Sequence, residues 1–243
     1  MSAARGALAG QVAIVTGAGR GIGHAVALAL ARESASVVLA SRTRQELAAA
    51  AATIRESGGT ALAIPTDVTQ DGAVEAMVEQ SVAELGRVDI LVTAAGVASF
   101  GPVVGTKPSD WDALLAVNLR AVMVSCRAVL PAMIRQRRGT IINIASVAAQ
   151  RAIPGAAVYT ATKAGVVGFS RVLAEELRAD HVRVGVLVPG AVDTPLWDSI
   201  GNPPDRSRML RPGDVARAAV LMASLPPGAS LEELTLLPAG GIL

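Results

Sequence analysis

The sequence predicts an α/β fold, a single doubly wound domain with a seven-stranded parallel sheet and helices on both faces. Short β-branched runs alternate along the chain with longer Ala- and Leu-rich stretches, as in parallel strands joined by right-handed helical crossovers. The β-branched runs are apolar at successive positions, so both faces of each strand would be buried. Apolar residues make up 51% of the chain and aromatic residues only 2%, which favours closely packed helices and argues against disorder.

The expected elements follow one another in βα order. Strands are expected at residues 12–16, 36–40, 61–65, 88–93, 140–145, 182–188 and 234–237. Helices are expected at about 22–33, 44–57, 70–85, 109–136, 157–179 and 213–224. Ser109 followed by Asp112 resembles a capping box at the start of the long fourth helix. No repeat, linker or change of composition divides the chain, so we expect one domain over residues 1–243.

Charge and composition argue against several classes of partner. The net charge is only +2, and the densest basic cluster, RQRR at 135–138, has no interleaved aromatic residues, so nucleic acid is not expected to bind. No apolar run approaches the roughly 18 residues of a membrane span, and the N-terminal residues do not resemble a signal peptide. A lone cysteine, Cys126, fits a reducing cytoplasm. His24 and His181 lack neighbouring ligands, so no metal is expected.

A glycine-rich loop follows the first expected strand directly. It reads TGAGRGIG over residues 16–23, with glycines at Gly17, Gly21 and Gly23, and a helix is expected to begin within it. Glycines at such a junction allow a tight turn and a close backbone approach, while the helix N-terminus offers free N–H groups to a pyrophosphate. The loop therefore predicts a dinucleotide site.

The end of the second expected strand indicates which dinucleotide would bind. A chain that selects NAD usually places an acid here for the ribose 2′-hydroxyl, whereas this chain has Ser41 and Arg42. Arg20 in the glycine loop adds a second positive charge. These residues predict NADP(H) in preference to NAD(H). The alternative is that Arg42 simply begins a solvated helix.

The third and fourth expected strands end in residues that suit the same ligand. Asp67 and Val68 could contact adenine by hydrogen bonding and apolar packing, respectively. The segment TAAG, residues 93–96, places small residues where the backbone would pass close to the cofactor. Ligands of open α/β sheets bind at the carboxyl ends of the strands, which is where all these residues are expected.

The only tyrosine, Tyr159, precedes one of two lysines, Lys163, by four residues in an expected helix, so both lie on one helix face. A nearby ammonium group favours the phenolate and would lower the tyrosine pKa from about 10. Ser146, just past the fifth strand, could hold a substrate oxygen. Asn118, unusual inside a helix, could hold a water that links Lys163 to solvent. We therefore expect acid–base chemistry at this end of the sheet.

In these motifs the chain resembles the short-chain dehydrogenase/reductase family over essentially its full length. The matching features are TGAGRGIG, Asp67, TAAG, Asn118, Ser146, the Tyr159-x-x-x-Lys163 spacing, and VPG at 188–190 with Thr194 behind it. The resemblance implies an NAD(P)-dependent oxidoreductase of CH–OH groups with a seven-stranded Rossmann sheet.

The same resemblance implies roles for individual residues. Tyr159 would be the general acid/base, Ser146 would position the substrate oxygen, Asn118 would support a proton-relay water, and Lys163 would lower the tyrosine pKa and bind the nicotinamide ribose. A lid at about 191–212, with Trp197 as a candidate member, would cover the substrate. The residues implied for cofactor binding are Gly17, Arg20, Gly21, Ile22, Gly23, Ser41, Arg42, Asp67, Val68, Ala95, Gly96, Tyr159, Lys163, Pro189, Gly190, Val192 and Thr194.

Two departures from the family pattern stand out: TAAG replaces the usual NNAG, and the C-terminus lacks the usual glycine-rich ending. We expect a small-molecule carbonyl or alcohol substrate and a homo-oligomer, either tetramer or dimer. A 3-oxoacyl-carrier-protein reductase is the main alternative, since Arg137 and Arg138 match one carrier-docking position, although Asp180 stands at the other. A catalytically silent dinucleotide sensor and a nucleotide-sugar epimerase are further alternatives.

Overall fold

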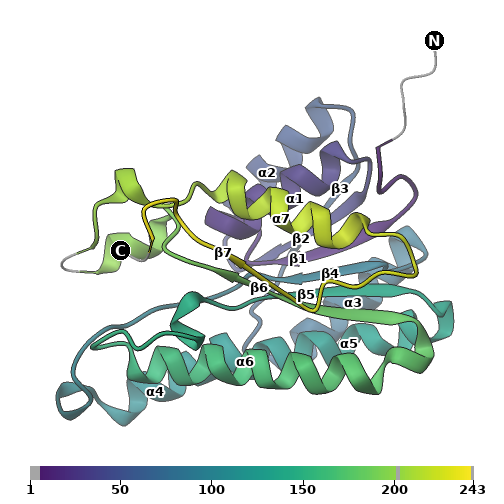
Figure 1. Ribbon diagram of the computed structural model, residues 1–243. Coiled ribbons are helices and arrows are strands. Elements are labelled where there is room, and N and C mark those ends of the chain that lie inside the picture. Colours follow the sequence, from purple (N-terminus) through teal and green to yellow (C-terminus); the bar gives the residue numbers. More distant parts are fainter. Residues whose placement is uncertain (1–5, 201–202, 242–243) are drawn as a thin grey trace.

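The computed structural model describes residues 6–200 and 203–241 (Figure 1). Its strands form one sheet in the order β3-β2-β1-β4-β5-β6-β7, and every neighbouring pair is parallel. The predicted seven-stranded α/β fold is confirmed. The strands are β1 (Val12–Thr16), β2 (Ser36–Ser41), β3 (Ala61–Pro65), β4 (Ile90–Thr93), β5 (Gly139–Ile144), β6 (Val182–Pro189) and β7 (Glu233–Leu236).

Helices cover both faces of the sheet and divide the core into two layers. One layer packs α1 (Gly21–Arg32), α2 (Arg44–Glu56) and α7 (Pro212–Ser224) on the sheet, and Figure 1 shows these helices together on one side. The other layer packs α3 (Asp71–Leu85), α5 (Ala121–Gln136) and α6 (Ala157–Glu176) on the opposite side. Strands buried on both faces explain the continuous apolar runs in the sequence.

The long helix before β5 differs from its expected form. Its first segment, α4 (Pro108–Leu115), has Lys107 as N-cap and Pro108 in its first turn, and the N-cap side chain makes no capping bond. The expected capping box at Ser109 and Asp112 is therefore wrong, because the proline begins the helix one residue earlier, with φ already suited to that position. A π-helical turn, Ala116–Arg120, then joins α4 to α5.

This helical run, Pro108–Gln136, is long and apolar enough by length and composition alone to cross a membrane. Core helices of soluble proteins meet the same criteria. Here Val122, Cys126 and Val129 are fully or almost fully buried in the layer that α5 shares with α3 and α6. One face of α5 thus packs in the core of the fold.

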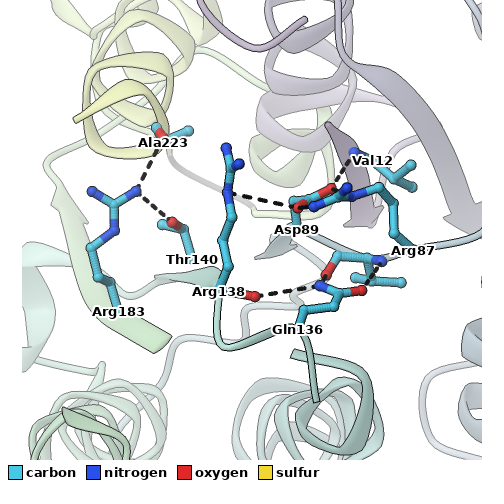
Figure 2. A network of polar contacts seen from close by, with 9 residues as sticks. Val12, Arg87, Asp89, Gln136, Arg138, Thr140, Arg183 and Ala223 are labelled. Atoms are coloured by element: carbon cyan, nitrogen blue, oxygen red, sulfur yellow. Dashed lines mark hydrogen bonds and ion pairs between the residues drawn. The ribbon is translucent and has the colours of Figure 1, made fainter. Parts of the chain in front are cut away.

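At the amino edge of the sheet, where the parallel strands begin, buried polar groups are tied together (Figure 2). Asp89 accepts hydrogen bonds from the Val12 amide at 2.9 Å and from Arg87 at 2.7 Å through each carboxylate oxygen. Arg183 donates to Thr140 Oγ1 at 2.7 Å and to the carbonyls of Leu225 and Ala229 at 2.9 Å, which holds the chain after α7 against the sheet.

Candidate active site

A cleft runs along the carboxyl edge of the sheet, where the parallel strands end. It is lined by the glycine loop after β1, the residues after β2, β3 and β4, the end of β5, the start of α6 and the first residues of the expected lid. The structure therefore brings together segments that lie far apart in sequence. The expected site residues that line this cleft are Gly17, Arg20, Gly21, Ile22, Ser41, Arg42, Asp67, Val68, Ala95, Gly96, Tyr159, Lys163 and Thr194.

The glycine loop has the geometry of an anion site. Gly17 and Gly21 adopt positive φ angles of 68° and 60°, which glycine adopts without strain. A Cβ on Gly17 would lie 2.7 Å from the Ala95 amide nitrogen, so only glycine permits this close approach. Helix α1 begins at Gly21, and its N-cap, Arg20, makes no side-chain capping bond. The first N–H groups of α1 are thus left for a ligand.

Four expected cofactor residues lie outside the cleft lining. Gly23 packs its α-carbon against the Gly17 carbonyl, which a side chain would obstruct. Pro189 ends β6, and the Gly190 amide donates to the Leu236 carbonyl at 2.8 Å. Val192 is 5% exposed and forms a bridge with Leu210. These positions shape the backbone under the cleft, and the side chains of Pro189 and Val192 are buried in the fold.

The end of β2 carries an unsatisfied buried hydroxyl. Ser41 Oγ is buried and has no hydrogen-bond partner among the described residues, while Arg20 and Arg42 are exposed beside it. A buried hydroxyl without a partner is costly unless a ligand supplies one. Asp67 accepts from the Thr69 amide and hydroxyl at 3.0 and 2.8 Å, and these bonds, with the positive charge of Arg42, lower the pKa of its carboxyl group.

Tyr159 and Lys163 line the other end of the cleft, and Ser146 follows the lining residues Ile144 and Ala145 at the end of β5. Ser146 caps a short turn after β5, where its Oγ accepts from the Ala148 amide at 3.2 Å. Lys163 is 5% exposed, its Nζ donates to the Ile144 carbonyl at 3.0 Å, and the same atom lies 5.9 Å from the centre of the Tyr159 ring. The side chains of Tyr159 and Lys163 thus lie close together in one part of the cleft.

The pKa values of Tyr159 and Lys163 differ from those expected from the sequence. Burial raises the pKa of the Tyr159 hydroxyl above its usual value, and the hydrogen bond with Ser146 only partly opposes this. Burial also lowers the pKa of Lys163 to about 8. The expected lowering of the tyrosine pKa is therefore not seen in the chain alone, because desolvation by burial outweighs the opposing hydrogen bond.

Asn118 lies in the π-helical turn and is fully buried. Its Oδ1 accepts from the Val97 amide at 2.9 Å, and its Nδ2 donates to the Val97 carbonyl at 2.8 Å. The side chain thus fastens the segment after β4, including Gly96, beside Lys163. Sequence reasoning missed the π turn, although such turns frequently occur at functional sites.

Three of the five aromatic residues gather over the chemical end of the cleft. Trp197 stacks on Phe100 with ring centres 6.0 Å apart and an interplanar angle of 7°, and Phe100 contacts the Tyr159 ring at 5.8 Å. Arg206 bonds Asp198 at 2.7 Å and the Thr194 carbonyl at 3.2 Å within the expected lid. Residues 201 and 202 of the lid, like residues 1–5 at the N-terminus, lie outside the described residues.

Among the lining residues that the sequence analysis did not single out, Glu46 is the charged one. Glu46, in the first turn of α2, faces the glycine loop beside Ser41. In the sequence it stands three residues after Thr43, a pattern that indicates a helix cap and so hides any other role. Within the described residues, no group of three or more His, Cys, Asp or Glu side chains is arranged to hold a metal ion.

Known proteins are similar to this chain in sequence and in fold. Residues 11–205 match the family described as short chain dehydrogenase. The chain is 36% identical to a 3-oxoacyl-[acyl-carrier-protein] reductase of a Synechocystis species, with 98% of each chain covered. A metagenomic short-chain oxidoreductase solved with NADP is 39% identical, with 96% of this chain and 99% of that chain covered and a TM-score of 0.85.

An alcohol dehydrogenase of Thermococcus sibiricus, solved with 5-hydroxy-NADP, is 31% identical, with 94% of this chain and 97% of that chain covered and a TM-score of 0.87. These likenesses extend over nearly the whole chain and include the strands and helices that form the cleft. The chain therefore belongs to the short-chain dehydrogenase/reductase family and is an oxidoreductase that acts on CH–OH groups.

Proposed function

We propose that this protein interconverts a ketone or aldehyde and the corresponding alcohol with NADP(H), using Tyr159 as the general acid/base. One observation carries the proposal: Tyr159 and Lys163 line one end of a cleft whose other end is a glycine loop and helix N-terminus suited to a pyrophosphate. An acid–base group and a phosphate site in one continuous cleft fit hydride transfer with a dinucleotide.

The residues of the cleft fit such a cofactor. The amides at the start of α1 would hold the pyrophosphate, Asp67 and Val68 would contact the adenine, and Thr194 and Lys163 would contact the nicotinamide half. When bound, the nicotinamide ring supplies or accepts the hydride. The unsatisfied Ser41 hydroxyl supports a phosphate on the adenosine ribose, because it lies buried where such a group would arrive.

In the direction of reduction, Tyr159 donates its hydroxyl proton to the carbonyl oxygen. Ser146 holds that oxygen, and its hydroxyl lowers the pKa of Tyr159 against the effect of burial. Lys163 has no carboxylate partner among the described residues, so its charge is free to stabilise the phenolate that forms. Asn118 positions the segment after β4 through Val97 and so keeps Gly96 beside Lys163.

The cofactor choice we propose is NADP(H) over NAD(H). Arg20 and Arg42 border the Ser41 hydroxyl, and the end of β2 carries no acid. Two of the related structures named above were solved with NADP or a derivative, which supports the same choice. Arginine pairs strongly with phosphate, so we expect at least about a tenfold preference in kcat/KM before any opposing charge is considered.

Tyr159→Phe tests the proposed chemistry. The variant keeps the ring that packs on Phe100 but removes the proton donor, so kcat on a panel of ketones should fall by roughly 10²–10⁴-fold. Binding of NADPH, followed by its fluorescence, should stay within about threefold of the original protein, since the phenol contributes mainly to proton transfer. Retention of more than a tenth of the original kcat would exclude Tyr159 as the acid/base.

The relative in Synechocystis favours a second candidate substrate, a 3-oxoacyl group on a carrier protein. One part of that idea fits poorly. Arg137 and Arg138 follow α5 at the amino edge, where Arg137 donates to the Ala179 carbonyl at 3.2 Å and Arg138 lies 3.9 Å from Asp89. They stand at the opposite edge of the sheet from the cleft of the same chain. A small carbonyl substrate thus remains the leading proposal.

We also propose a homo-oligomer, tetramer or dimer, located in the cytoplasm. Exposed apolar side chains on the helical run that carries Asn118 and on α6 support the assembly; Leu115 is 40% exposed, Met123 37% and Val172 60%. A second copy of the chain would cover these groups through close helix packing.

A further inference from the structure

Glu46 occupies a position in the cleft that its sequence context does not indicate. A Cβ added to Gly19 would lie 2.5 Å from Oε2 of Glu46 and 2.9 Å from Oγ of Ser41. Both oxygens therefore face the same point of the glycine loop. Ser41 ends β2, which is where Rossmann sheets contact the adenosine ribose, so the carboxylate would lie near the ribose of a bound dinucleotide.

Glu46 does not cap helix α2, which is the ordinary role of a glutamate at this position. Thr43 is the N-cap of α2 and makes no side-chain capping bond, and within residues 6–200 and 203–241 the Glu46 carboxylate accepts no hydrogen bond. Helix α7 shows the contrast, because Asp214 at the equivalent position accepts from the Arg211 amide at 2.8 Å. Glu46 could cap its helix in the same way but turns toward the loop.

The charged groups around this point are two arginines and two acids. Arg20 and Arg42 line the cleft on either side, and Asp67 lies across it with one oxygen engaged by Thr69. Among the described residues, Glu46 forms no ion pair with either arginine. An unpaired carboxylate thus lies beside an unsatisfied serine hydroxyl, and each lacks a partner that a ribose could supply.

We propose that Glu46 discriminates between the two cofactors at the 2′ position of the adenosine ribose. Its carboxylate accepts a hydrogen bond from the 2′-hydroxyl of NAD(H) and repels the 2′-phosphate of NADP(H). The proposal rests on the dinucleotide site proposed above. Arg20 and Arg42 attract the 2′-phosphate, and Glu46 opposes them, so the preference for NADP(H) is the balance of these charges. The acid that a chain selecting NAD places at the end of β2 is supplied here from the first turn of α2.

Glu46→Gln removes the charge and keeps the size of the side chain. The matched control is Glu56→Gln, which removes the same charge from the other end of α2, where the side chain is exposed. Adenosine 2′,5′-bisphosphate and AMP serve as probes in isothermal titration calorimetry. They differ in the 2′-phosphate and lack the nicotinamide, so their binding is independent of the proposed chemistry.

Glu46→Gln should bind the bisphosphate about tenfold more tightly and AMP about two- to threefold more weakly, because a neighbouring unit charge alters affinity for a phosphate on this scale. Glu56→Gln should change both affinities by less than about twofold. An equal change for both probes in Glu46→Gln, or no change, would overturn the role of Glu46 while leaving the dinucleotide site intact. Failure of the unaltered protein to bind either probe would overturn the site itself.

Discussion

The two edges of the sheet differ in how far their buried polar groups are hydrogen-bonded. At the amino edge, Asp89 is saturated by the Val12 amide and by Arg87, and Arg183 bonds to Thr140 and several carbonyls (Figure 2). At the carboxyl edge, Ser41 Oγ has no hydrogen-bond partner among the described residues. There Lys163 is buried, and its ammonium group donates to the Ile144 carbonyl. The first arrangement stabilises the fold, and the second leaves groups free for a ligand.

This difference implies that the cleft lowers the stability of the chain without its cofactor. Buried polar groups cost free energy unless they are bonded, so the amino edge should contribute stability and the carboxyl edge should reduce it. Substitutions at the two edges should therefore change the free energy of unfolding in opposite directions.

The largest effect is expected for Asp89→Ala. Removal of the carboxylate leaves the buried Val12 amide without a partner and separates Arg87 from its counter-ion, which should reduce the free energy of unfolding by about 3 kcal/mol. Urea denaturation would measure the loss. The matched control is Asp71→Ala, since Asp71 also pairs with an arginine, Arg120, but on the exposed surface, and it should cost much less. Equal losses in both variants would contradict the special role of the amino edge.

A smaller effect of opposite sign is expected for Lys163→Met. Burial lowers the pKa of Lys163 to about 8, so below pH 8 the folded chain carries a desolvated charge. Methionine removes this cost but also the bond to the Ile144 carbonyl, which leaves a net gain of roughly 1–2 kcal/mol at pH 7, while turnover should be lost.

The pH dependence of the same variant gives a second test. The folded-state pKa of Lys163 is depressed, so the unfolded chain binds more protons between pH 8 and about 10.4, and the stability of the unaltered protein rises through that interval. The advantage of Lys163→Met should therefore be constant below about pH 8 and shrink toward pH 10. A constant difference in thermal unfolding across that range would show that the lysine is not the source.

The sequence predicted the fold because its signals are local and repeated. Strand runs such as 12–16 and 61–65 have the observed bounds, and Gly17 and Gly21 have the positive φ angles that a tight turn requires. The same local signals failed at Ser109, where Pro108 starts the helix first, and around Asn118, where one π turn leaves the apolar pattern nearly unchanged.

Within the site, the sequence predicted which residues come together better than it predicted their burial and orientation. The spacing of Tyr159 and Lys163 placed them together, but it did not give their burial, which reverses the expected shift of the tyrosine pKa. Glu46 was missed because Thr43 and Glu46 form a capping pattern that the helix does not use. Burial and orientation depend on contacts between distant segments, such as Gly19 against α2, and these come only from the folded structure.

The smallest effect on stability, and the sharpest contrast between the edges, is expected for Ser41→Ala against Thr140→Val. Each removes one buried hydroxyl, but Thr140 Oγ1 accepts from Arg183 at 2.7 Å, whereas Ser41 Oγ has no partner in the described part of the chain. Thr140→Val should therefore reduce the free energy of unfolding by about 1–2 kcal/mol, and Ser41→Ala should raise it slightly, by about 0.5 kcal/mol.

For cofactor affinity the order should be reversed, with the larger effect in Ser41→Ala and the smaller in Thr140→Val. Ser41→Ala should weaken NADPH roughly tenfold, because a hydroxyl bonded to a phosphate is lost, and change NADH affinity by less than about threefold. Thr140→Val lies at the far edge of the sheet and should leave both affinities unchanged. Urea denaturation and fluorescence titration of the same two samples measure both quantities. A Ser41→Ala variant that loses stability but keeps NADPH affinity would place its hydroxyl with the structural groups of the amino edge, and the division between the edges would fail at that residue.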